Sequence, residues 1–163
     1  MNRLLFTSTN KSSHVEIEDY FPLRVVYESS IEDTQFVGFY YGDSDLLELS
    51  IDNDSKIIKK LQLVICNHYV FTNDVFNNDL NCLSGSIGFD YTQHNECEAF
   101  QVTVYTNAVI IKLSDAEPKK YFSCGQVVFG FLDDNEVSSV IVTGMSAREI
   151  EHTKSELSLG SKS

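Results

Sequence analysis

The sequence has no apolar run long enough to cross a membrane. Its longest runs, such as Val127 to Leu132, have the length of a strand, whereas a membrane helix needs about 20 residues. Near the start of the chain only Leu4 to Phe6 are consecutively apolar, which is too short for the apolar segment of a secretion signal. We therefore expect a soluble cytoplasmic protein with no membrane partner, in which the four cysteines are reduced thiols.

Motifs of common catalytic chemistry are also missing. The stretch Gly85 to Gly88 lacks the Lys-Ser or Lys-Thr that follows a phosphate-binding glycine loop. The stretch Asp52 to Ser55 opens like a calcium loop but lacks its glycine and its bidentate glutamate. Acidic pairs, including Asp43 with Asp45 and Asp133 with Asp134, lie at expected hairpin turns, where Asp caps the local backbone. We predict no enzyme, no catalytic residue and no cofactor.

Basic residues are scarce. Lys and Arg number 12 against 24 Asp and Glu, so the formal net charge is −12. A field of this sign repels nucleic acid, which excludes it as an expected partner. The region from Leu61 to Ile111 has no Lys or Arg at all and carries five acidic residues. Within it, residues 67–97 are rich in Asn and Gly, and a connection of this length is typically functional or contains unrecognised elements.

Apolar and polar residues alternate in several segments, which predicts half-buried strands. The first predicted hairpin joins Leu47–Asp52 to Ile57–Ile65 through an acidic turn, and the second joins Phe100–Tyr105 to Val109–Leu113. A third runs from Tyr121 to Leu132 and returns from Val137 to Thr143. Two further strands are expected at residues 23–28 and 34–41, and the only prolines, at positions 22 and 118, fall at strand margins.

Helix is predicted at the C-terminal end. Ser146 and Glu149 have the spacing of a capping box, which predicts a helix from Ala147 to Leu157 and a frayed tail over residues 158–163. The sequence neither predicts nor excludes a second helix before Leu23 or within residues 69–83, since neither segment has a clear capping residue. At 163 residues we expect a single domain over 1–163. Its class is α+β and strand-dominated, with a curved, mostly antiparallel, half-barrel-like sheet and one or two packed helices.

The basic-free region supplies the candidate contact surface. Its acids are interleaved with aromatic residues, a mixture that fits anchoring and selection of a basic partner. The alternative without a binding function is a solvated loop whose aromatic rings pack into the core. The nominated contact residues are Asp74, Phe76, Asp79, Phe89, Asp90, Tyr91, Glu96 and Glu98.

The cysteines and histidines of the same region give an alternative. Cys66 with His68, and His94 with Cys97, each place two metal-ligand types close together, with Cys82 between them. Neither pair has the cysteine spacing of structural zinc sites, so no metal is predicted. These residues could also supply a cysteine nucleophile with a histidine base, but any chain with four cysteines and four histidines offers such pairs by chance. The competing hypothesis is a small ligand-binding or metal-dependent β-barrel-like enzyme that uses this zone, and a third is an adaptor subunit of a larger assembly.

As a small, acidic, strand-rich chain without a catalytic motif, the sequence resembles the immunity proteins of bacterial contact-dependent growth inhibition systems. The resemblance covers the whole acidic, strand-rich chain and includes stretches such as Leu46–Asp52 followed by Ile57–Val64. It implies an antitoxin that binds a cognate basic toxin domain, a nuclease in many such systems, and neutralises it in a tight stoichiometric complex. No site residue follows from the resemblance, and the oligomeric state is left open.

Overall fold

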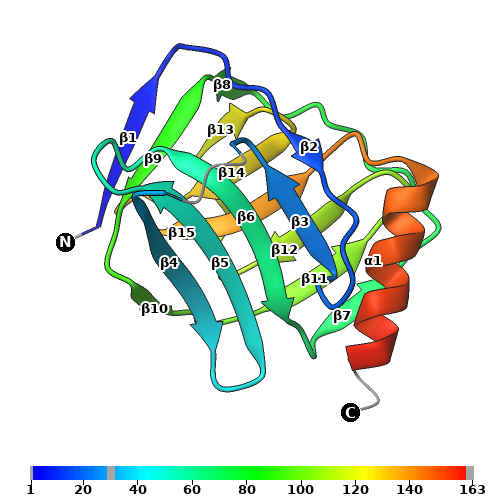
Figure 1. Ribbon diagram of the computed structural model, residues 1–163. Coiled ribbons are helices and arrows are strands. Elements are labelled where there is room, and N and C mark those ends of the chain that lie inside the picture. The colour runs from blue at the N-terminus through cyan, green and yellow to red at the C-terminus, as the bar shows by residue number, and fades with distance from the viewer. Residues whose placement is uncertain (1, 29–31, 161–163) are drawn as a thin grey trace.

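Strands dominate the structure, a computed structural model that describes residues 2–28 and 32–160. They form two large sheets that face each other, a two-stranded sheet at one end and a single helix at the other (Figure 1). The strand-dominated, mostly antiparallel class with a C-terminal helix is confirmed. The strands are divided among three sheets and do not close into a barrel.

The six-stranded sheet has the order β10–β4–β5–β6–β3–β2. Its strands are β2 (His14–Val15), β3 (Leu23–Val26), β4 (Thr34–Tyr41), β5 (Asp45–Asp52), β6 (Ile58–Ile65) and β10 (His94–Glu96). The first predicted hairpin, β5–β6, is confirmed, as are strands β3 and β4. Asp52 accepts backbone hydrogen bonds from Asp54 (3.0 Å) and Ser55 (2.8 Å), so this acid caps the turn as predicted.

The seven-stranded sheet has the order β7–β11–β12–β15–β14–β13–β8. Its strands are β7 (Tyr69–Phe71), β8 (Cys82–Ser84), β11 (Gln101–Val104), β12 (Val109–Lys112), β13 (Lys120–Cys124), β14 (Val127–Phe131) and β15 (Val137–Val142). The second predicted hairpin, β11–β12, is confirmed.

The long strand predicted from Tyr121 to Leu132 is wrong, because it is two strands. The chain reverses between β13 and β14 at Gly125, whose φ is +59°. A Cβ at this position would also lie 2.3 Å from the Ser13 hydroxyl oxygen. Glycine is therefore required here both by the backbone conformation and by the close approach of the N-terminal segment.

The core lies between the two large sheets. Alternate residues of β5 and β6, including Leu47, Leu49 and Leu61, face Phe129 and other fully buried residues of the opposite sheet. The two-stranded sheet consists of β1 (Arg3–Thr7) and β9 (Ser86–Asp90). It closes one end of this core and inserts Phe89, whose ring centroid lies 5.1 Å from that of Phe129.

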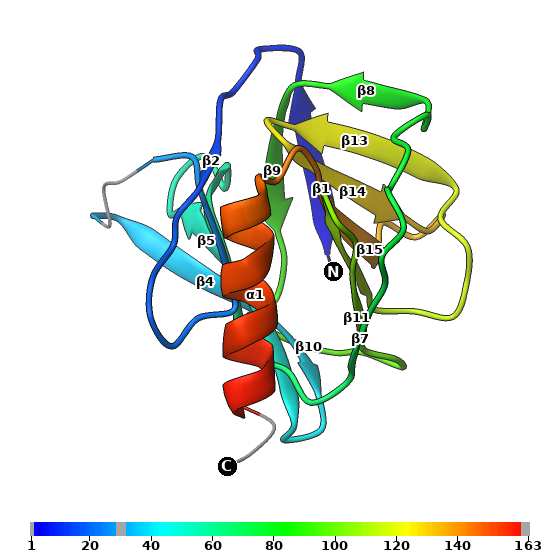
Figure 2. The ribbon, with the colours of Figure 1, turned by 90° about the vertical axis from the view of Figure 1, so that its right-hand side faces the viewer.

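The helix α1 (Ala147–Gly160) packs across the other end of the core, as the view of Figure 2 shows. The predicted capping box is present, since Ser146 and Glu149 exchange hydrogen bonds of 2.9 and 3.2 Å. Thr153 donates a 2.7 Å hydrogen bond to the carbonyl of Pro22, just before β3. The helix continues through Gly160, so the first three residues of the predicted tail are helical, and residues 161–163 lie outside the described residues.

The long connection of residues 67–97 contains four short strands and, in its described residues, no helix. Two of them, β7 and β8, form the opposite edges of the seven-stranded sheet although only ten residues, 72–81, separate them. Six inter-strand gaps span about 29 Å, and a chain segment of this length reaches at most about 40 Å. The segment, which we term the strap, therefore crosses the outer face of the sheet nearly extended (Figure 2).

Candidate functional site

One hollow of the described surface lies between the edge strand β10 and the turn that precedes β15. Its volume is about 410 Å³. Phe39 and Tyr91 form part of an apolar floor, and their ring centroids are 6.3 Å apart. The remaining lining residues come from β10 and the segment after it, from the segment after β12, from the turn before β15 and its first residue, and from the N-terminal end: Asn2, Asn95, Glu96, Cys97, Glu98, Leu113, Ser114, Glu136 and Val137.

Hydrogen bonds hold the walls of this hollow in place. The Tyr91 hydroxyl donates to the backbone carbonyl of Asn135 and so ties the segment after β9 to the turn before β15. The Asn95 side chain donates to the carbonyls of Gly38 (3.1 Å) and Thr92 (2.9 Å) and accepts from Asn2 (2.9 Å). Segments far apart in the sequence are thereby joined around one concave surface.

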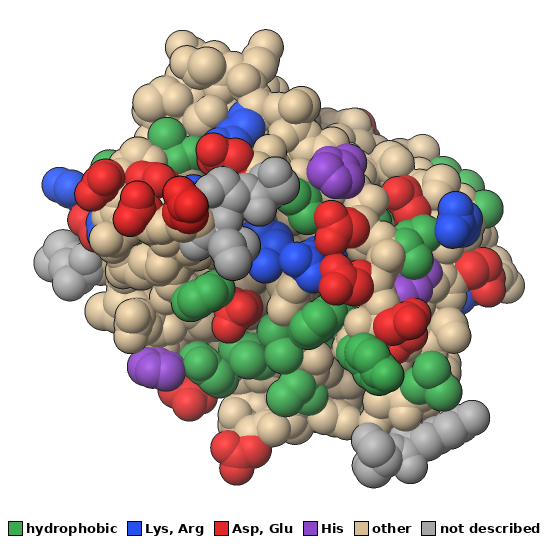
Figure 3. All heavy atoms as spheres, in the orientation of Figure 1, with side chains coloured by type: hydrophobic (Ala, Val, Ile, Leu, Met, Phe, Trp, Pro, Cys, Tyr) green, Lys and Arg blue, Asp and Glu red, His purple; other side chains and the backbone are tan. Residues whose placement is uncertain are grey.

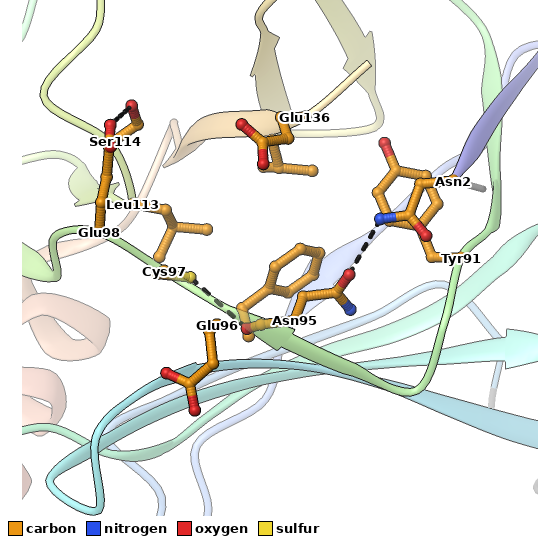
Figure 4. Close-up of a pocket in the computed structure, with 11 residues that line it drawn as sticks. Asn2, Tyr91, Asn95, Glu96, Cys97, Glu98, Leu113, Ser114 and Glu136 are labelled. Carbon is orange, nitrogen blue, oxygen red and sulfur yellow. Dashed lines mark hydrogen bonds between the residues drawn. The ribbon is translucent and has the colours of Figure 1, made fainter. Parts of the chain in front are cut away.

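Three glutamates surround the hollow, and no Lys or Arg is among its described lining residues. Glu98 accepts a hydrogen bond from the Ser114 hydroxyl. Figure 4 shows Glu98 and Glu136 on one side and Glu96 on the other, with its carboxylate directed away from them. None of the ion pairs formed by the described residues involves these three side chains. The carboxylates do not converge, so this arrangement suits the side chains of a partner better than a single ion.

The electrostatic field of these acids acts on their neighbours. Burial, together with the charges of Glu96 and Glu136, raises the pKa of the Cys97 thiol to about 12. Burial, together with Asp134 and Glu136, also raises the pKa of Tyr91. Both groups are therefore neutral at pH 7, and neither thiolate nor phenolate chemistry is available in the hollow.

The nominated contact residues occupy two separate places. Tyr91, Glu96 and Glu98 line the hollow, and Asp90 lies nearby on β9, 3.4 Å from Arg3. Asp74, Phe76 and Asp79 lie on the strap, where the Phe76 ring packs 5.7 Å from that of Tyr105.

One nominated ring, Phe89, is wrong as a surface contact, and a second, Tyr91, can be reached only as part of the floor of the hollow. Phe89 is fully buried and Tyr91 is 5% exposed, because both belong to the aromatic core. Sequence reasoning missed Glu136, since it follows Asp133 and Asp134 in a turn and carries no signal that separates it from a solvated turn acid.

The cysteines and histidines form a different arrangement from a metal centre. Cys66, Cys82, Cys97 and Cys124 are free thiols. Over residues 2–28 and 32–160, no group of three or more His, Cys, Asp or Glu side chains is placed to hold a metal ion. His94 packs its ring 5.3 Å from that of Tyr40, and burial raises the pKa of Cys66 to about 12.

His68 instead pairs with Asp45, whose side chain is completely buried. Its Nδ1 lies 2.7 Å from one Asp45 carboxylate oxygen. Asp45 also accepts hydrogen bonds from the Asn67 amide (2.8 Å) and the Ser44 hydroxyl (2.7 Å). Asp45 therefore fastens the β4–β5 turn to the segment after β6, which goes beyond the local turn-capping role that its position predicts.

Comparison with known proteins adds no family to this description: no family model matches the chain, and no curated protein matches it. Among the described residues, no helix is both long and apolar enough to span a membrane.

Proposed function

We propose that this chain is a binding protein of the immunity type, which neutralises a basic toxin domain by forming a stoichiometric complex. A nuclease is the toxin class that fits best, because a nuclease needs a basic surface to hold phosphate. An acidic inhibitor that covers this surface would block access of the nucleic acid.

The acidic hollow is the observation that carries the proposal. Its apolar floor can contact the aliphatic stem of a lysine or arginine, and its glutamates can accept hydrogen bonds from the charged head. Glu96 and Glu136 form no ion pair with another described residue. Their charge is therefore available to a partner.

The overall charge of −12 supports the same function through the rate of encounter. Complementary fields accelerate association of protein partners, and salt weakens this effect because exposed charges are screened over about 10 Å at 0.1 M. An inhibitor that must capture a toxin before it acts benefits from fast association.

The first experiment is capture of the tagged protein from its native host, followed by reconstitution with the purified partner and metal analysis of the same sample. Recovery of one basic domain in equal amount, with its toxic activity blocked in the complex, is the expected result. A solitary protein with bound zinc or a small molecule would contradict the proposal and favour the Cys/His hypothesis.

A pair of charge reversals then tests the hollow. Glu96→Lys with Glu136→Lys, and the control pair Asp54→Lys with Glu151→Lys, each change the net charge by four units, from −12 to −8. Both control residues are exposed and lie outside the hollow. We expect the hollow pair to slow association with the captured domain at low salt by at least about tenfold more than the control pair. Equal effects of the two pairs would remove the hollow from the interface.

A further inference from the structure

The described part of the chain leaves the outer face of the six-stranded sheet uncovered. Residues of β4 and β5 alternate, so that Val37, Phe39 and Leu47 point into the core while Phe36, Tyr40 and Glu48 point outward. Figure 1 looks onto this face, and no described element packs across it. Figure 3 shows hydrophobic side chains gathered on it beside side chains of both charge signs.

The centre of this face has little relief. Gly38 on β4 and Gln62 on β6 are both opposite Glu48 on β5, and Ser50 lies two residues further along β5. Gly38, Ser50 and Gln62 are buried. Apolar side chains surround them: Phe36 is 50% exposed and Ile65 is 45% exposed. A face with a low centre and apolar surroundings can approach another sheet at the usual distance of about 10 Å.

The charges of the face have both signs, unlike those of the chain as a whole. Glu48 on β5 and Lys60 on β6 are diagonal neighbours on adjacent strands. Glu48 is opposite Gln62, and Lys60 is opposite Ser50, two residues further along β5. Next to them, Arg24 lies 3.4 Å from Glu16 and also pairs with Glu18. A uniformly basic partner would meet Lys60 and Arg24 here, so the face requires a partner that carries both signs.

We propose that a second copy of this chain docks on this face, related by a two-fold axis that places Glu48 of each copy opposite Lys60 of the other. In an isologous contact each residue pair occurs twice, so the face must complement itself. A diagonal acid–base pair meets this requirement, because an axis that passes between the two side chains exchanges their positions. This inference does not depend on the proposed antitoxin function.

The area of the face determines how stable we expect the dimer to be. Six strands and up to eight residues per strand give at most about 29 by 26 Å, or about 750 Å². A standard interface uses about 800 Å² of each partner. Because β2, β3 and β10 are shorter than eight residues, the face is smaller than this upper bound and stays below the standard size. We therefore expect a dimer that dissociates on dilution.

Sedimentation equilibrium over a range of concentrations tests the proposal with the protein alone. The mass should rise from the 18.4 kDa of one chain towards twice that value. Glu48→Lys and Lys60→Glu should each raise the dimer dissociation constant by at least about tenfold. Lys112→Glu, an exposed residue of the other sheet, is the matched control and should leave it unchanged. Circular dichroism checks that each variant is folded.

Mixing the two variants gives the sharpest outcome. One chain with Lys at both positions and one with Glu at both positions should form a heterodimer as tightly as the original chain dimerises. A chain that stays monomeric at about 1 mM would overturn the proposal. So would a dimer that Lys60→Glu leaves intact, or a monomer whose outer sheet face binds a different protein.

Discussion

Replacement of Asp45 by alanine removes the acceptor of three hydrogen bonds at a fully buried position. The donors are the His68 ring, the Asn67 amide and the Ser44 hydroxyl, at 2.7, 2.8 and 2.7 Å. A buried donor that loses its partner costs about 1–3 kcal/mol. His68 is about half exposed at its side chain and can turn to water, so the amide and the hydroxyl carry most of the penalty.

We expect Asp45→Ala to lower the free energy of unfolding by about 3 kcal/mol. For a chain of this size the midpoint of thermal unfolding should fall by about 6–12 °C. Urea titration followed by circular dichroism measures the free energy, and a thermal scan gives the midpoint. His68→Ala should cost less than Asp45→Ala, because Asp45 keeps two of its three donors.

Asp43→Ala is the matched control. Asp43 lies two residues earlier in the same turn and is exposed, so its loss should change stability by no more than about 0.5 kcal/mol. If Asp45→Ala and Asp43→Ala had equal effects, the buried carboxylate would not fasten the turn as we describe.

Two further predictions concern Gly125 and the buried thiols. Gly125→Ala should destabilise the fold by about 1–3 kcal/mol in urea titration, because its φ is +59° and the new Cβ would lie 2.3 Å from the Ser13 hydroxyl oxygen. Gly42→Ala is the control and should cost less, because Gly42 also has a positive φ but a Cβ there would meet no close contact. Because the pKa values of Cys66 and Cys97 are raised to about 12 from 9.0, their protonated forms stabilise the fold fully below pH 9, and this stability should disappear between pH 9 and about pH 12. A Cys66→Ala, Cys97→Ala variant with an unchanged alkaline unfolding profile would contradict this.

Local patterns predicted the antiparallel hairpins well. In β5–β6 and β11–β12, period-two alternation and a short polar turn identify both strands and their pairing, because all the information lies within about twenty residues. The capping box of Ser146 and Glu149 located the helix start for the same reason.

The parallel edge strands could not be predicted in this way. Strands β7, β8 and β10 have three residues each, and their partners lie far along the chain, so no local pattern marks them. The division of β13 from β14 was readable in principle from Gly125, but the apolar residues on both sides favoured one continuous strand.

The candidate site was only partly predictable. Scarcity of Lys and Arg pointed to Glu96 and Glu98, yet the burial of Phe89 and Tyr91 depends on two sheets that meet only in three dimensions. Glu136 reaches the hollow through the same long-range packing.

The strap has a consequence for the order in which the protein folds. Strands β7 and β8 are made early by the ribosome, but each pairs in parallel with a strand made later, β11 and β13 respectively. The interior of the seven-stranded sheet must therefore be synthesised after both of its borders and fitted between them. Such non-local pairing slows folding and leaves the two border segments exposed to other chains until residue 124 has emerged. We therefore expect residues 69–84 to be a part of the nascent chain that a chaperone can protect until these partner strands are made.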